Sequence, residues 1–132
     1  MRIVLDTNVL VAGLLSAHAA PARVLQSILA GEVSVCYDSR IVAEYRQVLA
    51  RPKFAFDQEL TEDVIDWIEV SGELLIPPPL SVSLPDPDDV MFLEVAVAAN
   101  VDCLVTGNLR HFPQRRRHGV SVLKPMQFVE WY

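Results

Sequence analysis

The chain has 132 residues, a net charge of −6 at pH 7 and a pI near 4.9. This length is enough for one domain that buries roughly two-thirds of its unfolded surface. Although 52% of the residues are hydrophobic, no apolar run reaches the length of a transmembrane helix. Met1 and Arg2 leave no room for a signal peptide, and Cys36 and Cys103 lack metal-binding spacing. We therefore expect a soluble, cytoplasmic protein with reduced thiols and no membrane contact.

The negative charge argues against a general nucleic-acid binder, because such proteins usually carry basic stripes. Two features weaken this argument. Acidic residues gathered in one pocket would hold divalent cations, which reverse the local charge. The cationic side chains also crowd the C-terminal quarter of the chain, at Arg110, His111, Arg115, Arg116, Arg117, His118 and Lys124. Net charge alone therefore decides little about the ligand.

Short apolar runs alternate with segments of helical spacing. Residues 3–5 suit a strand covered on both faces, and Thr7 or Asn8 could cap the helix that follows at 9–15. In chain order, the pattern then predicts a helix (22–30), a strand (33–37), a helix (40–50), a helix capped by Thr61, a strand (74–76), a helix opened by Asp86 and Pro87, strands (102–106 and 120–123) and a closing helix from Pro125. Alternating strands and helices predict an α/β fold with a central, mainly parallel sheet.

Polar side chains follow the ends of these predicted strands. Asp6 comes directly after the first strand, where open α/β sheets keep their ligands, although alone it could equally turn the chain or cap a helix. Glu44 lies roughly one and a half turns into the helix after the second strand. Further candidates for the same edge are Asp86, Asp88, Asp89, Thr106 and Asn108. Because close carboxylates repel unless a cation neutralises them, and hard oxygens suit Mg²⁺ or Mn²⁺, this edge is a candidate metal site.

Four segments carry a resemblance to a known family. They are residues 3–8 (IVLDTN), Glu44 within 39–45 (SRIVAEY), residues 86–89 (DPDD) with 92–94 (FLE), and residues 104–108 (LVTGN) with 111–113 (HFP). Their order and intervals resemble those of PIN domains, in particular the bacterial and archaeal toxin components of toxin–antitoxin pairs, the VapC-like group. The resemblance spans nearly the whole chain.

The resemblance implies one PIN-like domain over residues 1–132, a three-layer α/β/α sandwich. It also implies a Mg²⁺- or Mn²⁺-dependent ribonuclease with an RNA substrate, a cognate antitoxin and a homodimeric state. Asp6, Glu44 and Asp89 would be the catalytic residues and would bind the metal. The fourth acidic position of the family is Asn108 here, which also counts as a ligand but brings no charge. One firmly bound metal ion is therefore the expectation.

Other residues would support this site or offer alternative ligands. Asp86 would cap its helix and Asp88 would face solvent or lie behind the ligands. Glu94 would substitute as a ligand if it shared the inward face of its helix, and is otherwise a lone acid on a helix flank. The supporting set is Thr7, Asn8, Asp86, Asp88, Glu94 and Thr106.

The arginines near the C-terminus have two possible roles. They would hold RNA phosphates, since the guanidinium fork matches a phosphate group, or they would only offset the negative charge of the protein. They are Arg110, Arg115, Arg116 and Arg117. Phe54 and Phe56 would stack on bases or, more commonly, pack. We assign little weight to acid–base roles for His18 and His111, because a metal-activated water needs no histidine.

Two other functions must be compared with the nuclease. A catalytically weak or inactive PIN-like module would bind RNA or protein without cutting. The replacement of the family's fourth acidic residue by Asn108 favours this module, whereas the presence of Asp6, Glu44 and Asp89 argues against it. A haloacid-type phosphatase would use Asp6 as its nucleophile. That enzyme would need aspartate at position 8, where the chain has Asn8, and no lysine partner is evident. We therefore favour the nuclease.

Overall fold

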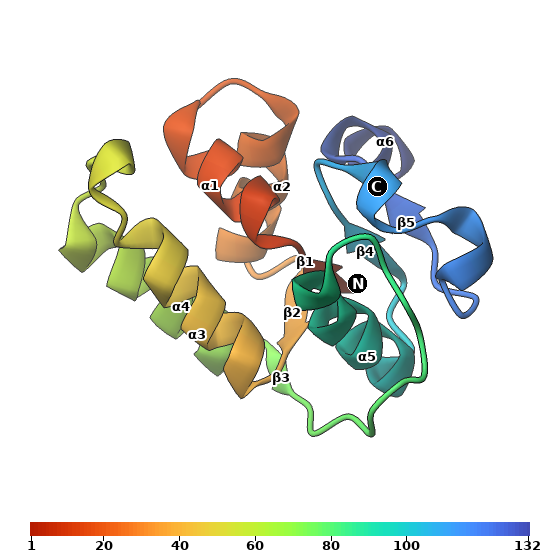
Figure 1. Cartoon of the computed structure of the whole chain (residues 1–132). Coiled ribbons are helices and arrows are strands. Elements are labelled where there is room, and N and C mark those ends of the chain that lie inside the picture. The colour runs from red at the N-terminus through yellow and green to blue at the C-terminus, as the bar shows by residue number, and fades with distance from the viewer.

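In the computed structural model, which describes residues 1–132, five parallel strands form one sheet in the order β3-β2-β1-β4-β5 (Figure 1). The strands are β1 (Arg2–Leu5), β2 (Ser34–Tyr37), β3 (Glu73–Leu74), β4 (Cys103–Val105) and β5 (Val122–Leu123). In the centre of the sheet Leu5 pairs with Val105. The predicted α/β architecture with a parallel sheet is confirmed.

Six helices cover the two faces of this sheet. They are α1 (Thr7–Leu15), α2 (Ala20–Leu29), α3 (Ser39–Leu49), α4 (Gln58–Ser71), α5 (Val90–Ala99) and α6 (Pro125–Trp131). Helix α5 packs against β1, β2 and β4, while α4 packs on β2, α6 packs on β5, and α2 contacts both α4 and α6 (Figure 1). No single helix is long and apolar enough to span a membrane; α1 and α2 pass that test only as a pair bent by 100°.

The strand order places the ends of β1 and β4 at a switch point. The chain runs outward from β1 to β2 and β3 on one side, and from β4 to β5 on the other. Because parallel crossovers are right-handed, reversing direction moves the connecting helices to the opposite face and opens a crevice between the two central strands. Asp6 and Thr106 follow these two strands directly. The site is therefore built where ligands of open sheets bind.

Buried apolar side chains fix this edge. Ile3, Val4 and Leu104 are fully buried in the sheet, which explains why these short strands read as continuous apolar runs. The hydroxyl of Tyr45, also fully buried, donates a hydrogen bond to the carbonyl of Leu5. This bond ties α3 to the end of β1, so Glu44 is carried beside Asp6.

Some predicted boundaries were wrong. Helix α4 begins at Gln58 with Asp57 as its N-cap, and the Thr61 hydroxyl instead donates to the Gln58 carbonyl. The segment opened by Asp86 begins as a 3₁₀ turn, η2 (Pro87–Asp89), before α5 starts. The predicted strand at 120–123 shortens to β5, and the one predicted at 74–76 is replaced by β3, which begins one residue earlier and shares only Leu74 with it.

Candidate metal centre

Asp6 directly follows β1, and its carboxylate is almost fully buried. Its side chain is 5% exposed, and its Oδ2 accepts a hydrogen bond from the Thr106 hydroxyl at 2.8 Å. The same hydroxyl oxygen accepts from the backbone N–H of Asn108. Burial raises the pKa of Asp6, and the Thr106 hydrogen bond partly opposes the shift. The Thr106 hydroxyl therefore fixes the orientation of the Asp6 carboxylate.

Glu44 reaches the same edge from α3. Its Oε2 accepts a hydrogen bond from the hydroxyl of Thr7. Burial raises the pKa of Glu44; the Thr7 hydrogen bond opposes this, and the negative charge of Asp6 adds to it. The expectation that Thr7 or Asn8 caps α1 was wrong. Asp6 is the N-cap residue, Thr7 holds Glu44, and the Asn8 side chain accepts from the Gly107 N–H.

Asp89 comes from η2, whose geometry is set by the residues before it. The Asp86 side chain caps the turn by accepting from the Asp88 N–H at 2.9 Å, and Pro87 opens it. Asp89 is then turned inward and is 7% exposed, whereas Asp88 is exposed. The Asp89 Oδ2 lies 2.9 Å from the Nδ1 of His111. Apart from this ion pair, that buried oxygen has no hydrogen-bond partner.

The crowding of charge shifts Asp89 strongly. Burial and then the negative charge of Asp6 raise the pKa of Asp89 to about 6, and His111 partly opposes the shift. Asp6, Glu44 and Asp89 are thus three carboxyl groups whose charged forms the protein disfavours by burial. A divalent cation bound among them would reverse these shifts.

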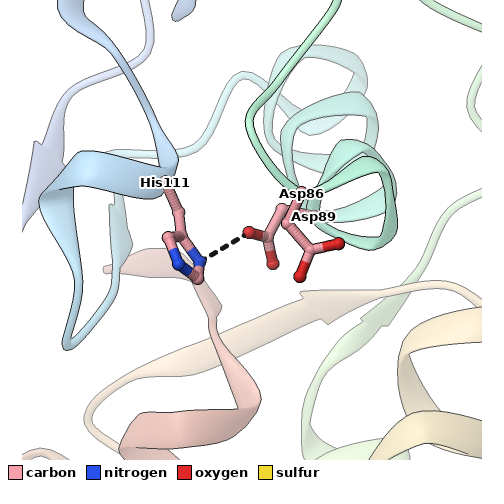
Figure 2. A group of neighbouring side chains, drawn as sticks. All are labelled: Asp86, Asp89 and His111. Carbon is pink, nitrogen blue, oxygen red and sulfur yellow. Dashed lines mark ion pairs between the residues drawn. The ribbon is translucent and has the colours of Figure 1, made fainter.

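One open cavity of about 440 Å³ collects these side chains. Figure 2 shows Asp86 and Asp89, from the turn η2 and its N-cap, beside His111. Other residues that line the cavity are Asp6, Thr7, Asn8, Glu44, Arg51, Phe54 and Asp88. The structure therefore brings together seven of the ten predicted ligands and supporting residues along the cavity wall, and adds Thr106 beneath Asp6.

Two predicted ligands are engaged elsewhere. The Asn108 side chain caps the 3₁₀ turn η3 (Leu109–His111), where its Oδ1 accepts from the Arg110 N–H. Glu94 is buried, and its two oxygens accept from Arg40 and from the Leu80 N–H, at 2.9 and 2.7 Å. Glu94 therefore lies outside the acidic cavity and holds the segment before η2 in place.

The predicted RNA-binding arginines also lie outside the cavity. Arg116 donates to the Ser83 carbonyl and Arg117 to the Phe112 carbonyl, so both fix loops. Arg110 and Arg115 line no part of the cavity either. The cationic and aromatic side chains that do line it are Arg51 and Phe54. Sequence reasoning underrated them because nothing in the sequence shows that Phe54, in the turn η1 (Pro52–Phe54), lines the same cavity as residues of α1 and α3.

His111 was given little weight in the sequence analysis, and its place beside Asp89 was not predicted. Its signal was its distance from Asn108: a 3₁₀ turn has about three residues per turn, so a residue three positions later returns to the same side. The donor set formed by Asp86, Asp89 and His111 fits a divalent metal. It offers hard carboxylate oxygens, one of them buried without a hydrogen bond, and one imidazole nitrogen.

Comparisons with known proteins agree with this fold. A family model described as the PIN domain matches residues 2–110. Among solved structures, a chain in the crystal structure of VapBC2 from Rickettsia felis, bound to a DNA fragment from their promoter, matches with a TM-score of 0.58 and 16% identity. The match covers 94% of this chain and 98% of that chain. No curated protein is found to match. Because the family model covers most of its length, the chain belongs to the PIN domain family.

Proposed function

We propose that this PIN-domain protein is a Mg²⁺- or Mn²⁺-dependent ribonuclease that hydrolyses internal phosphodiester bonds of RNA. The observation that carries the proposal is the convergence of Asp6, Glu44 and Asp89 on one open cavity. These three residues come from the end of β1, from α3 and from η2, which are far apart in the sequence. Burial disfavours the charge of each, which a structural role would not require.

Each acidic residue has a distinct task in this proposal. A bound divalent ion would act as a Lewis acid on the phosphodiester and would supply a nucleophile from water near neutral pH. Asp6 and Asp89 would hold the ion, with Glu44 as the third acid. Thr106 keeps Asp6 in place and Thr7 keeps Glu44 in place through the hydrogen bonds described above. Asp86 orders η2 and thereby presents Asp89.

The cavity also has features suited to single-stranded RNA. Arg51 is exposed and forms no ion pair, so its guanidinium is free to meet a phosphate. Phe54 is half-buried, and its ring stacks on that of Phe56 at 5.5 Å between centroids. Stacking on an aromatic ring next to a cation is a common way to hold an unpaired base. We therefore propose that a strand enters along Arg51 and Phe54, with Arg110 and Arg115 meeting more distant phosphates.

We further propose that residues 1–132 act as one domain that serves as the toxin of a toxin–antitoxin pair in the cytoplasm. Its partner would be an antitoxin protein, and the chain would form a homodimer. The similarity to a VapBC2 structure and the family resemblance support this role. Exposed apolar side chains such as Leu15, Leu60 and Val70 offer contact area. Sedimentation velocity of the purified chain tests the homodimer, and a monomer at micromolar concentration would refute it.

A catalytically weak or inactive PIN-like module that binds RNA or protein is the second candidate. The observation that favours it is the side chain of Asn108, whose oxygen is used within η3 and brings no charge to the cavity. Fewer charges should bind metal more weakly. This candidate predicts RNA binding that does not depend on metal and no cleavage.

A cleavage assay separates the two candidates. The substrates are a single-stranded RNA of mixed sequence, the same RNA as a duplex and the corresponding single-stranded DNA, each with Mg²⁺, Mn²⁺ or EDTA. The proposal predicts cutting of single-stranded RNA with metal and none with EDTA. A folded protein that cuts no substrate with either metal would support the binding module.

A further inference from the structure

The 3₁₀ turn η3 carries one side chain that the proposed reaction does not use. We propose that the His111 imidazole is a direct ligand of the metal ion, and that it gives the site a preference for Mn²⁺ over Mg²⁺. This inference rests on the proposed function only in requiring that the cavity binds a divalent ion. It adds a nitrogen donor to a site otherwise made of oxygens.

The geometry places His111 within reach of an ion held by η2. One donor atom each from Asp86, Asp89 and His111 all lie within 4.8 Å of one another (Figure 2). Two ligands of one ion lie at most about 4.4 Å apart, which is twice a bond of about 2.2 Å. Small side-chain rotations are therefore enough for Asp89 and His111 to share an ion, while Asp86 caps η2 beside them.

An independent observation points to a cation at this place. Asp89 is 7% exposed, and apart from the ion pair with His111 its buried Oδ2 has no hydrogen-bond partner. Buried carboxylate oxygens are nearly always hydrogen-bonded, so an oxygen with this single contact is suited to a bound cation. The Nδ1 of His111 faces this oxygen at 2.9 Å. A metal ion seated between these two side chains would satisfy Asp89 and would be bound by the imidazole at the same time.

The backbone holds His111 in this position. The Asn108 side chain caps η3, and the His111 N–H donates to the Asn108 carbonyl at 3.2 Å. The next residue, Phe112, is fully buried, and its carbonyl accepts from Arg117 at 2.8 Å. His111 is thus fixed between a capped turn and a core side chain. It meets the ion as a preorganised ligand and not as a mobile surface group.

A nitrogen donor changes which metal the site selects. Mg²⁺ prefers oxygen ligands and gives up its waters reluctantly. Imidazole suits the later divalent ions, whose affinity for such sites rises from Mn²⁺ through Co²⁺ to Ni²⁺. Removing the imidazole should therefore weaken Mn²⁺ binding on the order of 10- to 100-fold, as loss of a supporting group at a metal site does. Mg²⁺ binding should weaken much less.

Electron spin-echo spectroscopy of the full chain loaded with Mn²⁺ tests this directly, without RNA. The wild type should show modulation from a coordinated ¹⁴N nucleus. His111→Gln should lose it, whereas His18→Gln and His118→Gln should retain it; these are the other two histidines of the chain. Selective ¹⁵N labelling of histidine in the wild type should change the modulation, which needs no variant to fold.

Titrations with Mn²⁺ and Mg²⁺ complete the test. The inference is overturned if Mn²⁺ binds with no nitrogen coupling, or if His111→Gln weakens both metals equally. A wild type that binds neither metal would overturn the proposed function as well. Bound Mn²⁺ without nitrogen coupling would leave the nuclease proposal intact, so the two failures are distinguishable.

Discussion

Replacing Asp89 by asparagine should stabilise the metal-free protein. Burial and the neighbouring charge of Asp6 raise the pKa of Asp89 to about 6, from an ordinary value of 3.8. At pH 8 the folded protein must therefore hold a carboxylate that it would rather keep protonated. Asparagine has nearly the same shape and no charge, so it removes this cost. Residues retained for ligand binding often carry such a cost in stability.

The magnitude follows from the pKa difference. A shift of about 2 units corresponds to about 3 kcal/mol between the two protonation states. Water in the open cavity screens the charge, so we expect a gain of about 1–2 kcal/mol in the free energy of unfolding. The size of this gain depends on pH. Because the pKa of Asp89 is raised in the folded protein, the stability that protonated Asp89 gives the wild type is fully present below pH 4. It is lost as pH rises through about 6.

Urea denaturation in EDTA at pH 8 and at pH 4 measures this effect. Asp89→Asn should exceed the wild type at pH 8, and the difference should nearly vanish at pH 4. Asp88→Asn is the matched control, since Asp88 belongs to the same turn and is exposed. A loss of stability in Asp89→Asn at pH 8, or an equal gain in the control, would refute the reasoning.

Three further predictions follow from the site and the fold. Mn²⁺ at 100 times its Kd should raise the stability of the wild type by about 2.7 kcal/mol in a thermal-shift assay, and should fail to do so in Asp6→Asn. Phe54→Ala and Phe54→Leu should each raise KM for single-stranded RNA about tenfold, while Phe54→Tyr should not; a leucine variant with wild-type KM would mean that Phe54 only packs. Gly72→Ala should lower the free energy of unfolding by about 1–3 kcal/mol in urea, because the added Cβ would lie 2.2 Å from the Val35 carbonyl oxygen. An unchanged urea midpoint would contradict that packing.

Much of the fold could be predicted because buried strands appear in the sequence as continuous runs of apolar residues. The central strands β1 and β4 are covered on both faces, so they read as unbroken apolar runs followed by Asp6 and Thr106. The position of each run in an alternating pattern was enough to place these two side chains at one edge. The resemblance to PIN domains then selected Glu44 and Asp89, which local patterning could not.

The parts that sequence could not give depend on contacts between distant segments. Glu94 lies in α5, which follows directly after Asp89, yet its carboxylate accepts from Arg40 of α3 and lies outside the cavity. Phe54 belongs to the turn after α3, and only the folded structure shows that it lines the same cavity as α1. His111 was undervalued because its role depends on a carboxylate 22 positions earlier in the chain. Spacing within one element is readable from sequence, whereas pairing between elements requires the folded structure.

The most direct test of the central claim is the rate at which the protein cuts a labelled single-stranded RNA in Mn²⁺, compared with the rate of Asp6→Asn. The variant removes one charge from the metal site and almost no volume, so it should fold. The wild type should cut this RNA, and Asp6→Asn should lose cleavage while its fold, measured by circular dichroism, stays intact. Cleavage by Asp6→Asn at the wild-type rate would contradict a metal centre built on the end of β1.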